Sequence, residues 1–204
     1  MWALVQDGQV TETFNYAKGF VLNDTQYPKD IFNKWSQAEK EAIGIYEVIV
    51  DKTNYKNPEY YNNTNSTFAF ANNQVTESWG TATAKRLVDE NAVDENNQPI
   101  LDEDGNQLIN YGLKTIKKRI IKQQAAGLLA PTDWYVVKAT EVADYTVPAN
   151  ITTYRAAVRT KSNEMETAID NAANVDALEA LYAYTEQADG TSTRPLGEWP
   201  EEVI

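Results

Sequence analysis

The stretch VPANITTYRAAVR (Val147–Arg159) decides how the second half of the chain is organised. Proline is favoured in the first turn of a helix, so the valine-proline pair predicts that a helix begins near Asn150. Apolar residues then recur three, four or seven positions apart, which places them on one helical face. That face consists of Ile151, Tyr154, Val158, Met165 and Ile169. Arg155 and Arg159 lie beside it, a position typical of arginines that pack their stems on a neighbouring helix.

A second helix completes a helical hairpin in this region. It begins at Asn174, which is a favourable N-cap residue, and carries Asp176 in its first turn. The short connector NAAN predicts that the two helices run antiparallel. The proline-broken tail RPLGEWPEEVI is expected to dock on the rest of the chain through Trp199.

A basic helix is predicted upstream of this hairpin, in GLKTIKKRIIKQQAAGLL (Gly112–Leu129), and Pro131 ends it. Its apolar stripe is expected to face the core and consists of Leu113, Ile116, Ile120 and Leu128. Its cations are expected on the other sides, at Lys114, Lys117, Lys118, Arg119 and Lys122. The residues that follow, TDWYVV (Thr132–Val137), predict a short extended stretch.

The N-terminal part of the chain has the pattern of β-hairpins with one short helix. Asp7-Gly8 and Asn72-Asn73 are strong two-residue hairpin turns. Ser36 and Glu39 form a capping box that begins the helix. The β-branched run IYEVIV predicts a strand, whereas residues 15–30 are expected to be irregular. The inward residues of the second hairpin are expected to be Phe68, Phe70, Val75 and Trp79.

Together these patterns predict an α+β fold with three modules. Residues 1–88 form a β-rich N-terminal module, residues 89–110 an acidic connector with a hairpin, and residues 111–204 a helical C-terminal module. The connector has seven acidic and no basic residues between Asp89 and Asp104. Its hairpin turn is expected at Asp104-Gly105, and no internal repeat is evident.

The composition argues against an enzyme. The chain has no cysteine and no histidine, which removes thiolate and imidazole metal sites, cysteine nucleophiles and Ser-His-Asp triads. In DEDGN, Asp102, Asp104 and Gly105 match the third, fifth and sixth positions of an EF-hand loop. Ile100 and Tyr111, however, occupy its first and twelfth positions. We therefore expect no catalysis, no cofactor and no metal site.

The net charge of −12 repels nucleic-acid phosphates and anionic lipid. No window reaches eighteen apolar residues, and the first residues lack the basic and apolar regions of a signal peptide. We expect a protein that is made in the cytoplasm, stays soluble and binds neither nucleic acid nor membrane.

Two regions are candidates for binding. The loop KTNYKNPEYYNNTNS offers Tyr60 and Tyr61 as a platform for a sugar, with a plain surface loop as the alternative. The basic helix offers Lys117 and Lys118 as a docking surface for another protein subunit. The alternative is a solvated face that opposes the chain's own acidic stretch.

Three segments, in order, resemble the tail accessory and tail-fibre-assembly proteins of tailed bacteriophages. MWALVQDGQV is similar to their first hairpin, and YPKDIFNKWSQAEKEAIGIYEV to their W-s-x-x-E-x-x-x-I-G-I-Y-x-V segment. Their C-terminal module commonly has L-L-x-x-x-D-W, a turn, and then W/Y-x-x-Y-R-x-x-L/V-R. The matching residues are Leu128, Leu129, Asp133, Trp134, Val147, Pro148, Tyr154, Arg155, Val158 and Arg159. The resemblance covers most of the chain apart from the acidic stretch. The continuation ANVDALEALYAYTEQADG is closer to variants that are virion structural proteins.

The resemblance implies a non-enzymatic structural protein of the virion. It would be an adaptor or accessory subunit at the tail, baseplate or fibre attachment, made in the host cytoplasm and present in several copies per virion. Its partners would be other tail subunits, docked through Trp134, Tyr154, Arg155, Arg159, Lys117, Lys118 and Trp199. The alternatives are a tail-fibre assembly chaperone and a receptor-binding tip protein, whose Tyr60 and Tyr61 would bind a host surface glycan.

Overall fold

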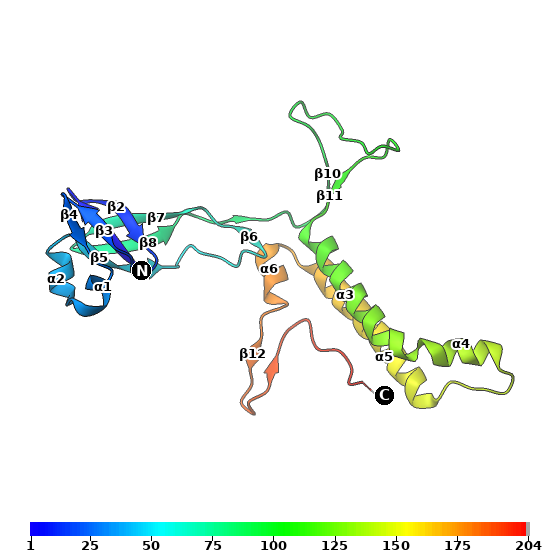
Figure 1. The fold of residues 1–204 in the computed structure, drawn as a ribbon. Coiled ribbons are helices and arrows are strands. Elements are labelled where there is room, and N and C mark those ends of the chain that lie inside the picture. Colours follow the sequence, from blue (N-terminus) through cyan, green and yellow to red (C-terminus); the bar gives the residue numbers. More distant parts are fainter. Residues whose placement is uncertain (203–204) are drawn as a thin grey trace. The chain divides into compact units, whose positions relative to one another are not determined.

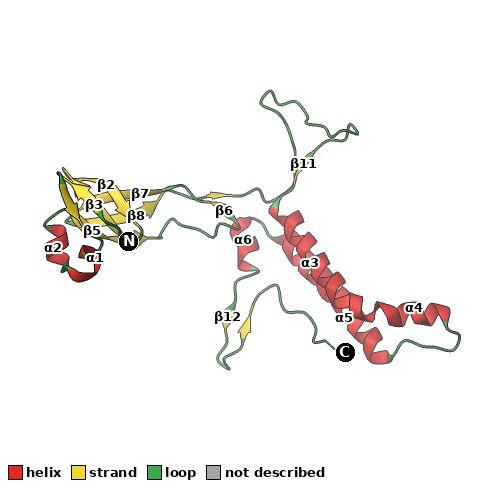
Figure 2. Ribbon diagram, in the orientation of Figure 1, coloured by secondary structure: helices red, strands yellow, loops and turns green. Residues whose placement is uncertain are grey.

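The structure, a computed structural model, describes residues 1–202 of the 204-residue chain (Figure 1). It has the α+β fold predicted from the sequence, with most of the strands in the first part and the long helices in the second (Figure 2). The chain forms two compact units, Met1–Thr83 and the residues from Ala84 onward.

The first unit is built on a five-stranded sheet with the strand order β2-β1-β5-β8-β7. β5 and β8 run parallel, and the other neighbours run antiparallel. The remaining strands form two small two-stranded sheets, β3-β4 and β6-β9. The elements are β1 (Trp2–Gln6), β2 (Gln9–Phe14), β3 (Phe20–Leu22), β4 (Thr25–Tyr27), α1 (Ile31–Lys34), α2 (Gln37–Glu41), β5 (Ile45–Asp51), β6 (Tyr61–Asn62), β7 (Ser66–Ala71), β8 (Gln74–Trp79) and β9 (Thr83–Ala84).

Local signals predicted much of this unit correctly. Asp7-Gly8 and Asn72-Asn73 adopt positive φ at both positions, as two-residue hairpin turns require, and they join β1 to β2 and β7 to β8. The capping box is also confirmed. The Glu39 N–H donates to Ser36 Oγ (3.3 Å), and the Ser36 N–H donates to the Glu39 carboxylate (2.8 Å).

The expectation of irregular backbone over residues 15–30 was wrong, because β3 and β4 form a third hairpin there. Its turn is Asn23-Asp24, again with positive φ at both positions. Phe20 and Tyr27 pair across the two strands and stack with ring centroids 5.3 Å apart. Phe20 also contacts the rings of Phe14 and Phe32 in the core between the hairpins and α1. Burial of these rings fixes a segment whose own pattern is weak.

The second unit contains the long helices and a protruding arm of residues 88–111. Helices α3 and α5 lie along one another, and the core between them includes Ile121, Ala125, Tyr154 and Val158. The elements are β10 (Glu90–Asn91), β11 (Ile109–Asn110), α3 (Leu113–Leu129), a 3₁₀ turn (Ala130–Thr132), α4 (Asp133–Glu141), α5 (Ala149–Asn171), α6 (Val175–Ala180), β12 (Thr185–Glu186) and β13 (Ser192–Thr193).

Two expectations about this unit were wrong. The segment TDWYVV is not extended. Thr132 is the last residue of the 3₁₀ turn, and Asp133–Val137 form the first part of α4. Pro131 does not interrupt the helical backbone here, because it lies in the first turn of the 3₁₀ helix, where proline is tolerated. The buried face of α3 is also a different one, since Ile116 and Ile120 are 42% and 38% exposed. The residues of α3 that are buried are Leu113, Lys117, Ile121 and Ala125, which are spaced four apart.

Lys117 lies on the buried face of α3. Its ammonium lies 4.3 Å from the centroid of the Tyr182 ring. A lysine can be buried when its stem packs on apolar neighbours and its charge meets an aromatic face. Lys117 is therefore buried, whereas all the lysines and the arginine of α3 were predicted to lie on the outer sides of the helix.

The arm contains an eight-residue repeat, so the expectation that the chain has no internal repeat was wrong. VDENNQPI (Val93–Ile100) and LDEDGNQL (Leu101–Leu108) each form a tight turn with one residue, Asn97 or Gly105, at positive φ. In each turn an aspartate carboxylate accepts two backbone N–H bonds of 2.8–3.0 Å, at Asp94 in the first repeat and Asp102 in the second. The turn expected at Asp104-Gly105 is thus confirmed, and the turn at Asn97 is its equivalent in the first repeat.

The two turns and the β10-β11 stem meet in a three-way junction. Its backbone hydrogen bonds form a closed cycle. The Ile100 N–H donates to the Ala92 carbonyl, the Ala92 N–H donates to the Leu108 carbonyl, and the Leu108 N–H donates to the Ile100 carbonyl. The Gln107 side-chain amide lies at the centre and contacts all three carbonyl oxygens, at distances of 2.7–3.1 Å. The arm therefore has a defined shape without a large apolar core of its own.

The junction predicts a specific effect of Gln107→Leu. Loss of the amide leaves three carbonyl oxygens without their shared donor, so we expect the amides of Ala92, Ile100 and Leu108 to exchange with solvent at least tenfold faster. Hydrogen exchange followed by NMR measures this directly. Gln98→Leu is the control, because the Gln98 amide contacts only the Asn96 carbonyl, at 3.4 Å. Equal protection in both variants would contradict the role of Gln107.

Candidate protein docking surface

A corner joins α3, α4 and α5, and Arg155 stands at its centre. The buried guanidinium donates to the Leu129 carbonyl (3.0 Å) and to the Thr132 hydroxyl oxygen (2.5 Å), and it pairs with the Asp133 carboxylate (2.8 Å). Thr132 is fully buried and donates in turn to the Leu129 carbonyl (2.7 Å). The end of α3, the 3₁₀ turn and the start of α4 are thus held by one side chain of α5.

Tyr154 and Trp199 complete the inner side of this corner. The Tyr154 hydroxyl donates to the Leu128 carbonyl (3.3 Å), and burial followed by the nearby Glu202 charge raises the pKa of that hydroxyl. Trp199 packs on the same core cluster and donates from Nε1 to the Gln124 side chain (3.1 Å). The tail therefore docks on its own chain through Trp199, as expected from the sequence.

The outer side of the corner is α4, and it exposes large apolar residues. Not one residue of α4 is buried. Trp134 is 51% exposed, and the Lys138 ammonium lies between its ring and that of Tyr145, 5.8 and 4.4 Å from the two centroids. Trp134 and Val137 are three residues apart and so share one face of the helix, and large exposed apolar side chains mark sites of association. We call this set the α4 surface: Trp134, Val136, Val137 and Val142.

The other residues expected to dock on partners have different environments. Tyr154, Arg155 and Lys117 are buried and serve the fold, so they offer no surface to a partner. Lys118 is half-buried and pairs with Asp170 of α5 (2.7 Å). Arg159 is exposed, and its guanidinium donates to the Arg155 carbonyl (3.4 Å). Val136 and Val137 of the α4 surface were not expected to dock, because the segment TDWYVV was predicted to be extended; Val142 lies outside that segment.

The proposed sugar platform does not have exposed rings. Tyr60 and Tyr61 are 2% and 4% exposed, and the Lys56 ammonium lies 4.4 Å from the centroid of the Tyr61 ring. Stacking on a sugar requires an open aromatic face, which neither residue offers. We correct the glycan prediction for these two tyrosines accordingly.

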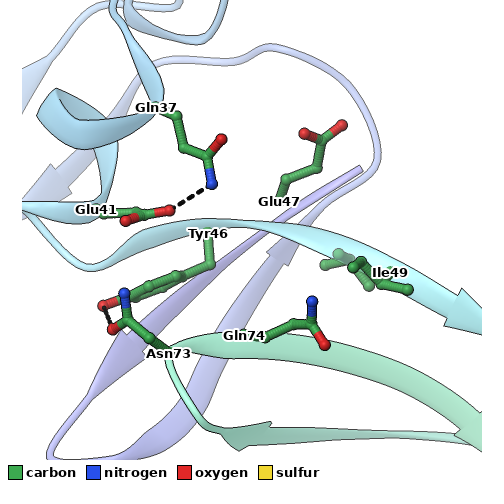
Figure 3. Close-up of a pocket in the computed structure, with 8 residues that line it drawn as sticks. Gln37, Glu41, Tyr46, Glu47, Ile49, Asn73 and Gln74 are labelled. Atoms are coloured by element: carbon green, nitrogen blue, oxygen red, sulfur yellow. Dashed lines mark hydrogen bonds between the residues drawn. The ribbon is translucent and has the colours of Figure 1, made fainter.

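A shallow polar pocket lies in the first unit, where α2 faces β5 and the β7-β8 turn (Figure 3). Its polar groups mainly bond to each other. The Gln37 amide donates to the Glu41 carboxylate (2.6 Å), and the Tyr46 hydroxyl donates to Asn73 Oδ1 (3.2 Å). Such a pocket can form hydrogen bonds, but it contains no nucleophile paired with a base. Its lining is Gln37, Glu41, Tyr46, Glu47, Val48, Ile49, Asn73 and Gln74.

Residues 1–202 contain no cluster of three carboxylates that could hold a metal ion. The Asp102 carboxylate instead caps its own turn, and the backbone N–H of Asn106, its main donor, lowers the pKa of that carboxyl. In the same described range, no helix has both the length and the apolar character needed to cross a bilayer.

No protein-family model matches the chain, and the curated proteins and solved structures also give no match.

The corner predicts that Arg155 and Arg159 differ sharply in their contribution to stability. Arg155→Ala leaves the Leu129 carbonyl and the Thr132 hydroxyl without their donor, so we expect a loss of about 2–3 kcal/mol. Arg159→Ala removes an exposed side chain with one long hydrogen bond, and we expect a change within about 0.5 kcal/mol. Urea unfolding of both variants measures the difference. Similar urea midpoints for the two variants would show that the stability of the corner does not depend on Arg155.

Proposed function

We propose that the chain is a non-enzymatic structural protein of a tailed-phage virion, an adaptor or accessory subunit that docks on neighbouring tail subunits. The observation that carries this proposal is the α4 surface. It is displayed by a corner whose residues are those of the tail-protein motif: Leu128, Leu129, Asp133, Trp134, Tyr154 and Arg155. In this view the motif is a scaffold that projects an apolar helix toward a partner.

The chemistry of the chain is consistent with a docking role. No histidine or cysteine is available for catalysis, and the polar pocket lacks a nucleophile with a base. The α4 surface offers tryptophan and valines, and tryptophan is among the residues that dominate binding energy at protein interfaces. A tail-fibre assembly chaperone would use the same surface for a transient client, and particle content distinguishes the two roles.

The first prediction of this proposal concerns purified particles. Mass spectrometry of gradient-purified virions should find the protein at a fixed ratio to the major capsid protein, in a copy number that is a multiple of three or six. Protein that is abundant in infected cells but absent from particles would instead support the chaperone. Absence from both particles and fibre complexes would reject docking in the tail altogether.

The second prediction concerns the α4 surface itself. Trp134→Ser combined with Val137→Ser should lower incorporation into particles by at least about tenfold, because an interface loses two apolar anchors. The melting temperature should change little, since no residue of α4 is buried. Val21→Ser is the matched control, an exposed valine on β3. Normal incorporation of the double variant would remove α4 from the docking site.

A further inference from the structure

Two apolar surfaces in the second unit are left unpartnered by the fold. The first is on the arm, where six large apolar side chains are 37–53% exposed: Val88, Val93, Ile100, Leu101, Leu108 and Ile109. The second is the face of α3 that was expected to be core and carries Ile116 and Ile120. Exposed apolar groups on a preorganised element favour association, because little conformational entropy is lost on binding.

These two surfaces carry opposite charges. The arm has seven acids and no base between Asp89 and Asp104, whereas α3 has five bases and no acid. Helix α5 carries three charges of each sign, so the α3-α5 pair keeps the positive charge of α3. On α3, the Lys122 side chain is 66% exposed even though it reaches Glu166 (3.3 Å).

The carboxylates of the arm divide into two groups. Four are used within the chain: Asp94 and Asp102 cap the turns, Glu90 pairs with Arg86, and Asp89 accepts from Gly112. The other three, Glu95, Glu103 and Asp104, are exposed at the tips of the turns. Within residues 1–202 these three carboxylates make no hydrogen bond or ion pair. They are available to cations outside the chain.

The root of the arm is held against the first turn of its own α3. The Asp89 carboxylate accepts from the Gly112 N–H (2.7 Å) and the Thr115 hydroxyl (2.9 Å), at the first turn of α3. The N–H groups of Leu113 and Lys114 donate to the carbonyls of Arg86 and Leu87, in the segment that enters the arm. A Cβ at Gly112 would lie 2.4 Å from the Val88 backbone, so the two segments are in direct contact. The arm thus leaves α3 at a fixed point (Figure 1).

We infer that the arm of one copy of this chain docks on α3 of a second copy. Acidic turn tips would meet Arg119 and Lys122, and the exposed apolar side chains of the arm would cover Ile116 and Ile120. The two surfaces differ, so the contact is head-to-tail, and repeated contacts form a ring or an open chain. This inference goes beyond the proposed function, because it depends only on the charges and apolar faces of the second unit.

A charge-swap experiment tests the contact. The arm variant carries E95K, E103K and D104K, and the helix variant carries R119E and K122E. In each variant alone like charges face each other, so association should weaken by more than about tenfold. An equimolar mixture restores opposite charges in both orientations, so the higher-mass species should return. Sedimentation velocity and native mass spectrometry measure the masses, and melting temperatures verify that each variant folds.

The wild-type protein should associate in low salt and dissociate as salt rises toward about 1 M, because salt screens the charges. E47K/E186K/E201K is the control: it makes the same change in net charge with three exposed glutamates outside the arm, and it should associate as the wild type does. A wild-type protein that stays monomeric at 100 µM in low salt would overturn the inference. So would a mixture of the two variants that stays monomeric. The virion role is tested by the protein content of particles and the arm-α3 contact by the mass of the purified protein, so one proposal can be rejected without the other.

Discussion

One buried cation determines the architecture of the helical unit. The Arg155 guanidinium bonds to Leu129, Thr132 and Asp133, which belong to three consecutive elements. A buried guanidinium is stable only when its donors are satisfied, and here a carbonyl, a hydroxyl and a carboxylate surround it. Because these partners follow one another along the chain, the arginine sets the direction in which α4 leaves α3. The same interaction that stabilises the corner therefore exposes the apolar side chains of α4.

The parts of the fold that were predictable from the sequence depend on local chemistry. Two hairpin turns and the capping box need only two to four neighbouring residues, and each was located correctly. The hairpin at Asn23-Asp24 was missed, since its strands are three residues long and gain their stability from rings elsewhere in the core. The repeat in the arm was also missed. Its equivalent positions share backbone geometry more than residue identity, as Asn97 and Gly105 illustrate.

The candidate site was predictable only in part, for the same physical reason. Trp134 was identified from the motif, but Val136 and Val137 were assigned to an extended stretch because β-branched residues favour extended backbone. Periodicity predicted a core-facing stripe on α3 that includes Ile116 and Ile120, and both of these are exposed. On the face that is buried, the Lys117 ammonium contacts the ring of Tyr182, which lies far along the chain. A pattern of apolar residues cannot reveal such a partner.

The arm shows how a strongly acidic segment can be both ordered and available for binding. Its carboxylates repel one another, yet Asp94 and Asp102 each fix a turn by accepting backbone N–H bonds. The lowered pKa of Asp102 means that its contribution is present above the ordinary pKa of an aspartate and is lost as the pH falls through the lowered value. The ionised form therefore shapes the arm at neutral pH. With its shape fixed from within, the arm presents Glu95, Glu103 and Asp104 outward, and the long-range field of these charges is attractive only to a basic surface.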